Sequence, residues 1–367
     1  MKELDTNEMT SKPEANQTES FQKHWFCVAQ TFSGTTIKQD AESPADFPEI
    51  LKQANIAWID YRTDNFDRDA PLAAARMGFS DALISSLTGE SPLTYQDLET
   101  EMGIRYPSIQ IREFEVKLHP LLLLLRKSFI LSIHPITVDR RFIRLRRYSD
   151  TVLRKIPADA CAEDKLALLL IRIIDEANER NFEHLRQIEE QGDALHKELT
   201  NPDMPRETLA PKIYDMKHAL ITYLDALWHS VDVLNALRYG DAELITDNAK
   251  LLARMTLLAD DVNRQIGLAE HLSEVLASGL EVLQTIYNNQ LQVLNNRMAL
   301  VIVYLTIVGT AVLVPNTLAT IFSNSAFDMQ SNDIWWYVTL LVVSTVVSTW
   351  FVYWFLKKRG WIPKSMD

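Results

Sequence analysis

The chain has 367 residues and a formal net charge of −12, with 47% hydrophobic and 23% charged residues. This composition is ordinary for a folded protein of one or two domains and does not separate soluble from membrane proteins. The acidic balance argues against nucleic acid as a partner and is compatible with a domain that meets cations.

Residues 1–24 lack the apolar core of a signal peptide, so we expect a disordered cytosolic tail. From residue 25 to 156, short strand and helix signals alternate between Pro, Gly and Asp, which predicts an α/β domain. Its expected strands are HWFCVAQTF, NIAWIDY, SIQIREFEVKL, LLLLLRKSFILSIH and RRFIRLRR, and its expected helices are PEILKQA and AAARMGFSDALISSLT.

Helical patterns replace the strand signals over residues 157–297. Apolar periodicity predicts one helix over about 163–199 and a second over about 207–237, which we expect to pack antiparallel because the break between them is short. A third helix starts near Ile245 and meets no proline before Pro315. At 1.5 Å per residue it runs for about 100 Å, which is typical of a stalk or coiled coil.

Two uncharged apolar runs close the chain, at residues 298–322 and 334–356. Each exceeds the about 20 residues that a helix needs to cross a bilayer, and two adjacent runs favour membrane helices over buried core helices. The tail 357–367 is basic, whereas the loop 323–333 has two aspartates and no base. By the positive-inside rule, both termini lie in the cytosol and the loop lies outside.

Hydroxyl and amide side chains recur at helical spacing along the third helix and the first apolar run. In hydrocarbon they need a partner or water, although a lone threonine can bond the carbonyl one turn earlier. A register of four threonines favours either a polar seam between helices or a water-filled lumen, and a lumen requires several copies of the helix around an axis. The predicted lining residues are Asn289, Gln292, Asn296, Ala299, Val303, Thr306, Thr310, Leu313, Thr317 and Thr320.

Neither apolar run contains an acid, a lysine, an arginine or a histidine, which favours passive conduction over proton exchange within the membrane. Neutral oxygens suit an ion that keeps its waters, as Mg²⁺ does, and Asp328 and Asp333 would attract cations to the outer mouth. The chain has no phosphate-binding loop, HExxH, GxSxG or dinucleotide motif, so we expect neither an enzyme nor a bound cofactor.

The order of these parts resembles the CorA family of divalent-cation channels: an acidic cytosolic α/β domain, a helical hairpin, a long stalk helix, two C-terminal transmembrane helices and a basic tail. Local matches are AWIDYR, SFILSIH, NNRMALVIVYLT, VPNT and LKKRGWI, and the resemblance covers about residues 25–361. It implies a homopentamer in the inner or plasma membrane that conducts Mg²⁺, with Co²⁺ or Ni²⁺ as further substrates. It also implies a regulatory cytosolic Mg²⁺ site, for which Asp260 and Asp261 are candidates.

The sequence departs from this family at the outer mouth, because the Gly-Met-Asn signature is absent. Alignment on Pro315, Thr317 and Phe327 places Asn324, Ser325 and Ala326 at those three positions. We expect Asn324 or Ser325 to replace the signature asparagine. Two other functions stay open: a Zn²⁺ transporter on the same scaffold, and a membrane-anchored sensor or scaffold protein that moves no ion and uses the polar register as a packing seam.

Overall fold

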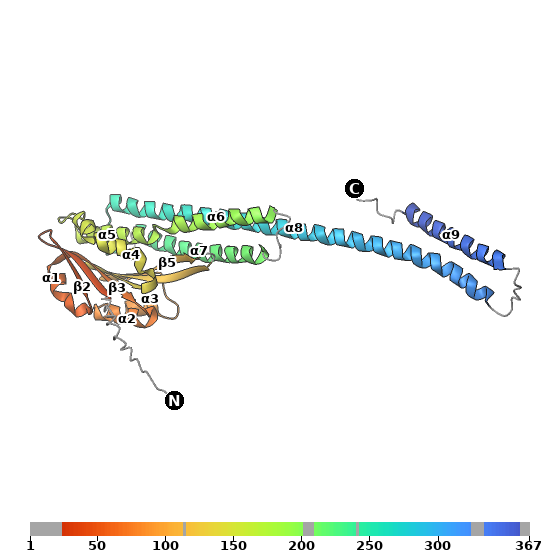
Figure 1. Cartoon of the computed structure of the whole chain (residues 1–367). Coiled ribbons are helices and arrows are strands. Elements are labelled where there is room, and N and C mark those ends of the chain that lie inside the picture. Colours follow the sequence, from red (N-terminus) through yellow and green to blue (C-terminus); the bar gives the residue numbers. More distant parts are fainter. Residues whose placement is uncertain (1–23, 113–114, 201–208, 240–241, 324–333, 360–367) are drawn as a thin grey trace, which may run out of the picture. The chain divides into compact units, whose positions relative to one another are not determined.

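A computed structural model describes residues 24–112, 115–200, 209–239, 242–323 and 334–359. The chain divides into two compact units, Met1–Ala277 and Ser278–Asp367. The first unit holds a seven-stranded sheet and its covering helices. The second holds the C-terminal part of a long helix and one further helix (Figure 1).

The sheet of the first unit has the strand order β2-β1-β3-β7-β6-β5-β4. Neighbouring strands are antiparallel except for β3 and β7, which are parallel. The strands are β1 (Trp25–Thr31), β2 (Thr36–Ala41), β3 (Ala54–Thr63), β4 (Tyr95–Asp97), β5 (Glu101–Arg112), β6 (Glu115–Arg126) and β7 (Phe129–Pro135).

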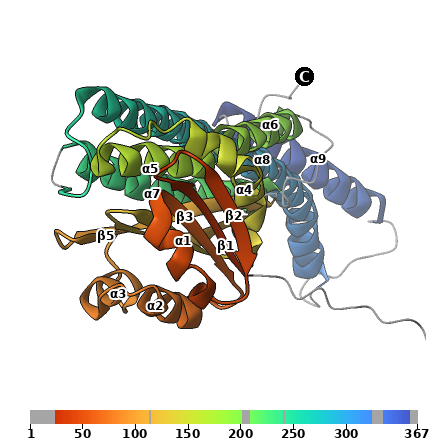
Figure 2. The same ribbon diagram turned by 90° about the vertical axis from the view of Figure 1, so that its left-hand side faces the viewer.

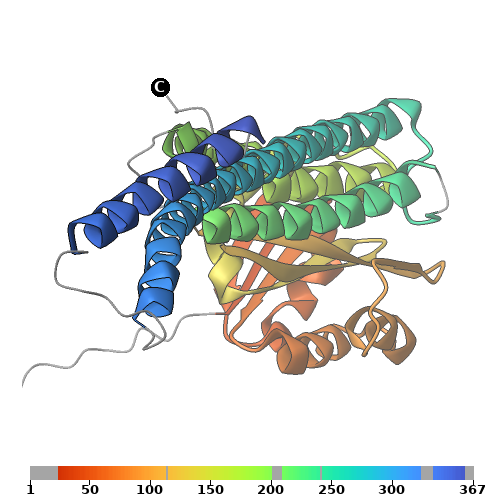
Figure 3. The ribbon, with the colours of Figure 1, turned by 90° about the vertical axis from the view of Figure 1, so that its right-hand side faces the viewer.

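Helices cover both faces of this sheet (Figure 2 and Figure 3). One face carries α1 (Pro48–Gln53), α2 (Phe66–Arg76) and α3 (Asp81–Thr88). The other carries α4 (Asp139–Arg154), α5 (Ala162–Asn178) and α7 (Leu209–Arg238), and single-turn helices stand at Pro44–Asp46 and Ile136–Val138. Because both faces are covered, a central strand can be apolar along its length, and all five leucines of 121–125 are fully buried.

Gly103 in β5 lets α3 approach the sheet closely. A Cβ atom here would lie 2.1 Å from Leu87 Cδ1 and 3.1 Å from Leu124 Cδ2, and both leucines are fully buried. We therefore expect Gly103→Ala to lower the free energy of unfolding by about 1–3 kcal/mol through overpacking. Denaturant unfolding followed by intrinsic tryptophan fluorescence, to which buried Trp25 and Trp58 contribute, measures this. Gly267→Ala is the control, because no atom lies within 4 Å of its added Cβ; equal stability of both variants would contradict the prediction.

The stretch AAARMGFSDALISSLT, predicted as one helix, contains the end of α2 and all of α3. Gly78 has a positive φ of 85°, which ends the first helix in the conformation that glycine favours. Ser80 then caps the second helix, because its hydroxyl accepts a hydrogen bond from the Leu83 N–H. The Gly and Ser signals were present in the sequence, but the surrounding apolar pattern masked them.

The stretch RRFIRLRR, predicted as a strand, belongs to helix α4. Phe142, Leu145, Ser149 and Leu153 are buried at steps of three or four, while Arg147 is exposed, so the helix packs along one face. Eight residues were too few to reveal this period against the β-propensity of Phe and Ile. The stretches SIQIREFEVKL and LLLLLRKSFILSIH each span parts of two strands, β5 with β6 and β6 with β7.

The helix predicted over 163–199 is also two helices, α5 and α6 (Asn181–Thr200). Buried amides occupy the break: the Asn181 amide donates to Asn178 Oδ1 at 3.2 Å, and the Tyr223 hydroxyl donates to the Asn181 carbonyl at 2.8 Å. A Lys212–Glu198 ion pair of 3.0 Å joins the other ends of α6 and α7. The two pairings run in opposite sequence directions, so α6 and α7 are antiparallel, as predicted.

A buried charged cluster joins β3, β7 and α4. The Asp60 carboxylate is 1% exposed, lies 3.0 Å from Arg146 Nε and 3.3 Å from His134 Nε2, and accepts a hydrogen bond from the Ser132 hydroxyl. Ser132 in turn accepts from the Trp58 indole N–H at 2.9 Å. Burial raises the pKa of Asp60, but its neighbours His134, Arg146 and Ser132 outweigh burial and hold the pKa below its usual range.

Two long helices account for the described residues of the second unit. Helix α8 (Ala249–Phe322) enters the unit at Ser278, and α9 (Ile334–Lys358) follows. Both can cross a bilayer by length and composition, and only 0% and 6% of their most apolar windows are buried, unlike core helices. As predicted, α8 joins the stalk to the first apolar run without a break and continues through Pro315.

Candidate functional site

The predicted lining residues lie along one side of α8 in the second unit. Val303 and Thr310 are half-buried, and the other eight of the ten are exposed in the single chain. Most of this polar register therefore has no cover from its own chain, including Thr306, Thr317 and Thr320 at the membrane-spanning level.

Helix α9 packs against a different side of α8. Ile307, Ala311 and Leu318 are half-buried, and Ile307 lines a pocket with α9 residues. The ring of Phe322 meets that of Trp336 edge-to-face at 5.9 Å. At about 100° per residue, the side centred on Ile307 is roughly a quarter turn away from Thr306 and Thr317. Val303 and Thr310 lie nearer to this side and are half-buried, whereas the exposed members of the register lie away from α9.

The four threonine hydroxyls of the register bond to their own helix. Thr306, Thr310, Thr317 and Thr320 donate to the carbonyls of Ile302, Thr306, Leu313 and Asn316, at 2.5 to 2.8 Å. A hydroxyl has one hydrogen to donate and two lone pairs that accept. With the hydrogen used inside the helix, each threonine oxygen can act only as an acceptor toward its surroundings.

The C-terminal end of α9 has a feature that the sequence analysis missed. Lys357, Lys358 and Arg359 each lie over an aromatic ring four residues earlier, with 5.0 to 5.8 Å between the charged group and the ring centroid. The sequence YWFLKKR contains the signal, since residues four apart are neighbours on a helix. Cation–π contacts of this kind hold the positive charges close to the end of the apolar helix.

The predicted outer-mouth residues Asn324, Ser325, Asp328 and Asp333 lie outside the described residues. Their contact with an ion stays a prediction.

The predicted regulatory carboxylates lie in the first unit, on α8. Asp260 is exposed, and Asp261 pairs with Arg264, which lies over the Phe182 ring. Among the described residues, no group of three or more His, Cys, Asp or Glu side chains is placed to hold a metal ion. The described part of one chain therefore offers two adjacent carboxylates here, and a metal there needs further oxygen ligands.

Comparison with protein families gives one match that covers most of the chain. Residues 53–358 match the family described as CorA-like Mg²⁺ transporter protein. No curated protein gives a significant sequence match.

Solved structures share the fold at low sequence identity. The complete CorA magnesium transporter from Methanocaldococcus jannaschii is 20% identical with a TM-score of 0.64, and the match covers 92% of this chain and 98% of that one. The full-length CmaX protein is 15% identical with a TM-score of 0.59, and the match covers 92% of this chain and 100% of that one. The ZntB cytoplasmic domain from Vibrio parahaemolyticus RIMD 2210633 is 14% identical with a TM-score of 0.52, and the match covers 72% of this chain and 98% of that one. The matches to both full-length proteins extend over the sheet, the long helix and the apolar helices.

Proposed function

The chain belongs to the CorA-like Mg²⁺ transporter family, and from this premise we propose that it forms a homopentameric channel for Mg²⁺ uptake, with the polar register of α8 as the pore lining. The observation that carries the proposal is the row of acceptor-only threonine oxygens on a side of α8 that α9 leaves uncovered. A polar face in this position needs either water or another copy of the helix.

A pore from this chain requires several copies, because two transmembrane helices cannot enclose a lumen. In the proposed assembly α8 forms the inner ring and α9 the outer ring. The exposed apolar residues of α9, among them Val342, Val343 and Val347, then face lipid. The uncharged α8 span from residue 298 to 322 gives the ion a neutral path.

Hydrated Mg²⁺ suits this lining because it releases its waters reluctantly and those waters donate hydrogen bonds. The threonine oxygens and the amides of Asn289, Gln292 and Asn296 supply acceptors. Co²⁺ and Ni²⁺ are expected as further substrates. Asn324 or Ser325 takes the place of the signature asparagine, and Asp328 and Asp333 attract the ion to the mouth.

The proposed orientation has both termini in the cytosol of a cell with the chain in its inner or plasma membrane. Lys357, Lys358 and Arg359 at the end of α9 mark the cytosolic side by the positive-inside rule. Mg²⁺ then moves inward down the membrane potential without proton exchange, since no acid, lysine, arginine or histidine lies in either span. Asp260 and Asp261 are proposed to take part in Mg²⁺ regulation between subunits, and no enzymatic activity is expected.

Uptake by proteoliposomes tests this function. The purified chain is reconstituted, and entry of Mg²⁺, Co²⁺, Ni²⁺ and Zn²⁺ is followed with and without a pH gradient. We expect Mg²⁺ entry that increases with an inside-negative potential and does not depend on the pH gradient. Entry of Zn²⁺ alone would assign a Zn²⁺ transporter, and entry of no ion would indicate the non-transporting sensor or scaffold.

A further inference from the structure

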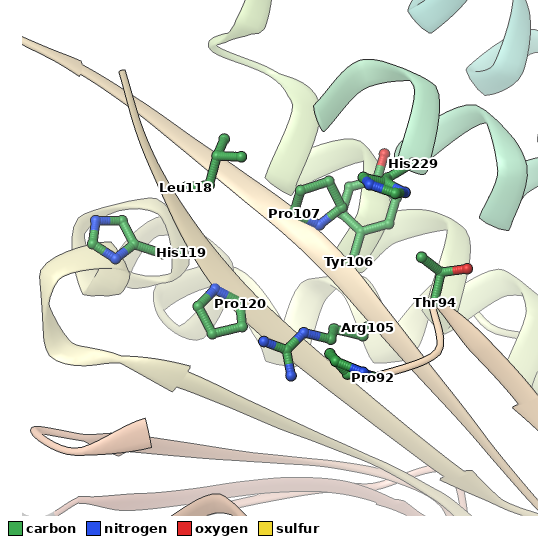
Figure 4. Close-up of a pocket in the computed structure, with 9 residues that line it drawn as sticks. All are labelled: Pro92, Thr94, Arg105, Tyr106, Pro107, Leu118, His119, Pro120 and His229. Atoms are coloured by element: carbon green, nitrogen blue, oxygen red, sulfur yellow. The ribbon is translucent and has the colours of Figure 1, made fainter. Parts of the chain in front are cut away.

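A pocket of about 230 Å³ lies in the first unit, beside the point where β4 ends and β5 continues as the edge of the sheet. Pro92, Pro107, Leu118 and Pro120 supply apolar walls, and Arg105 lies among them (Figure 4). The pocket is far in sequence from the α8 register and takes no part in the proposed ion path.

Among the residues that line this pocket, Arg105 carries the permanent charge. It is half-buried, donates one hydrogen bond to the Leu87 carbonyl at 2.9 Å, and lies over the Phe66 ring at 5.8 Å. Within the described part of the chain it forms no ion pair with a carboxylate. A guanidinium has five N–H donors, and the hydrogen bond to Leu87 uses one of them. The others are available to a bound ligand.

The electrostatics of Arg105 agree with this geometry. Burial lowers the pKa of its guanidinium, and the more distant charge of Asp67 does not cancel the effect. A partly buried cation without an anionic partner is costly, and an oxyanion that accepts two of its hydrogen bonds would offset the cost.

Two histidines also line the pocket, His119 from β6 and His229 from α7. His229 lies beside Tyr106 and Pro107 in Figure 4 and is half exposed. Its charged neighbour is Asp225, one turn earlier, with 3.7 Å between His229 Nε2 and Asp225 Oδ2. Asp225 therefore places a negative charge beside His229 at the α7 end of the pocket, where it would oppose a bound anion.

We propose that this pocket binds a small organic anion, a carboxylate or phosphate ester, through the Arg105 guanidinium. The cation selects the negative group, and the apolar walls favour a ligand with a carbon skeleton over a bare inorganic ion. Such anions are common chelators of divalent cations. The site would therefore bind molecules that compete with the pore for the ion.

Titration calorimetry on the full-length chain in detergent tests the assignment, with citrate as the organic anion, inorganic phosphate as the bare oxyanion and glycerol as the neutral probe. We expect citrate to bind more tightly than phosphate and glycerol not to bind. Arg105→Gln should weaken citrate binding at least about tenfold, because it removes a charge-assisted bidentate contact. Arg186→Gln, on the exposed face of α6, is the matched control and should bind citrate as the wild type does.

Asp225→Asn gives an independent measurement, because this change leaves the contacts of Arg105 with Leu87 and Phe66 in place. Removing its negative charge should tighten citrate binding about two- to threefold, as expected for an exposed charge. Absence of citrate binding at millimolar concentration overturns the proposal. So does equal citrate affinity in the wild type and a folded Arg105→Gln variant, or looser binding by Asp225→Asn.

Discussion

Thr317→Leu is expected to reduce Mg²⁺ uptake by at least about tenfold while the protein still assembles. In the proposed pentamer this change replaces five acceptor oxygens by five apolar side chains at one level, and such a ring excludes water and hydrated ions. The membrane helix itself should tolerate leucine, since the Thr317 hydroxyl bonds only to the Leu313 carbonyl of its own helix. Proteoliposome uptake and the oligomer size in detergent are the two measurements.

Val308→Leu provides the matched control for this experiment. Val308 is exposed on the same helix, about 180° around the axis from Thr317, so the same leucine there should leave uptake unchanged. Thr317→Ser keeps the hydroxyl and should retain most of the transport. Unchanged uptake in an intact Thr317→Leu oligomer would remove Thr317 from the lumen and would favour the packing-seam interpretation.

Asp60→Asn should lower the free energy of unfolding at neutral pH by about 3–5 kcal/mol. The change leaves Arg146 and His134 without the carboxylate that they share, and a buried cation without its partner is strongly destabilising. Denaturant unfolding followed by far-UV circular dichroism measures this. Asp215→Asn on an exposed position of α7 is the control and should change stability by less than about 0.5 kcal/mol.

The effect of Asp60→Asn should also depend on pH. The pKa of Asp60 is lower in the folded chain than its usual value, which is about 3.9 in an unfolded chain. Its contribution to stability is therefore fully present above that value and is lost as pH falls through the folded pKa. The difference in stability between wild type and variant should shrink only in strong acid. A difference that is constant down to the lowest measurable pH would contradict the role of the ionised carboxylate.

Sequence patterns predicted the long helices of the C-terminal half well, because these helices depend on the length and charge of their segments. An apolar run of more than 20 residues has few alternatives, so α9 and the continuation of α8 through Pro315 followed from composition. The errors came from short windows. RRFIRLRR was too short to separate helix from strand, and the break at Asn178–Asn181 depends on amide partners that are distant in sequence, including Tyr223.

The candidate site was predictable in part for a similar reason. Helical geometry alone places Thr306, Thr310, Thr317 and Thr320 along one side of a helix. Which side α9 covers could not be predicted, because both helices present apolar residues all round. The buried Asp60 cluster left only a faint signal, an aspartate inside the apolar strand AWIDY, and its partners His134 and Arg146 lie more than 70 residues away.

The direction of the threonine hydrogen bonds has a consequence for counter-ions. Each hydroxyl proton is committed to a main-chain carbonyl of α8, so the wall has no O–H left with which to solvate chloride. At the levels of the threonines, cation and anion would thus be told apart by main-chain geometry, without any formal charge within the membrane. Because neither hydroxyls nor carbonyls titrate near neutrality, a channel with this wall would keep its preference for cations at any cytosolic pH.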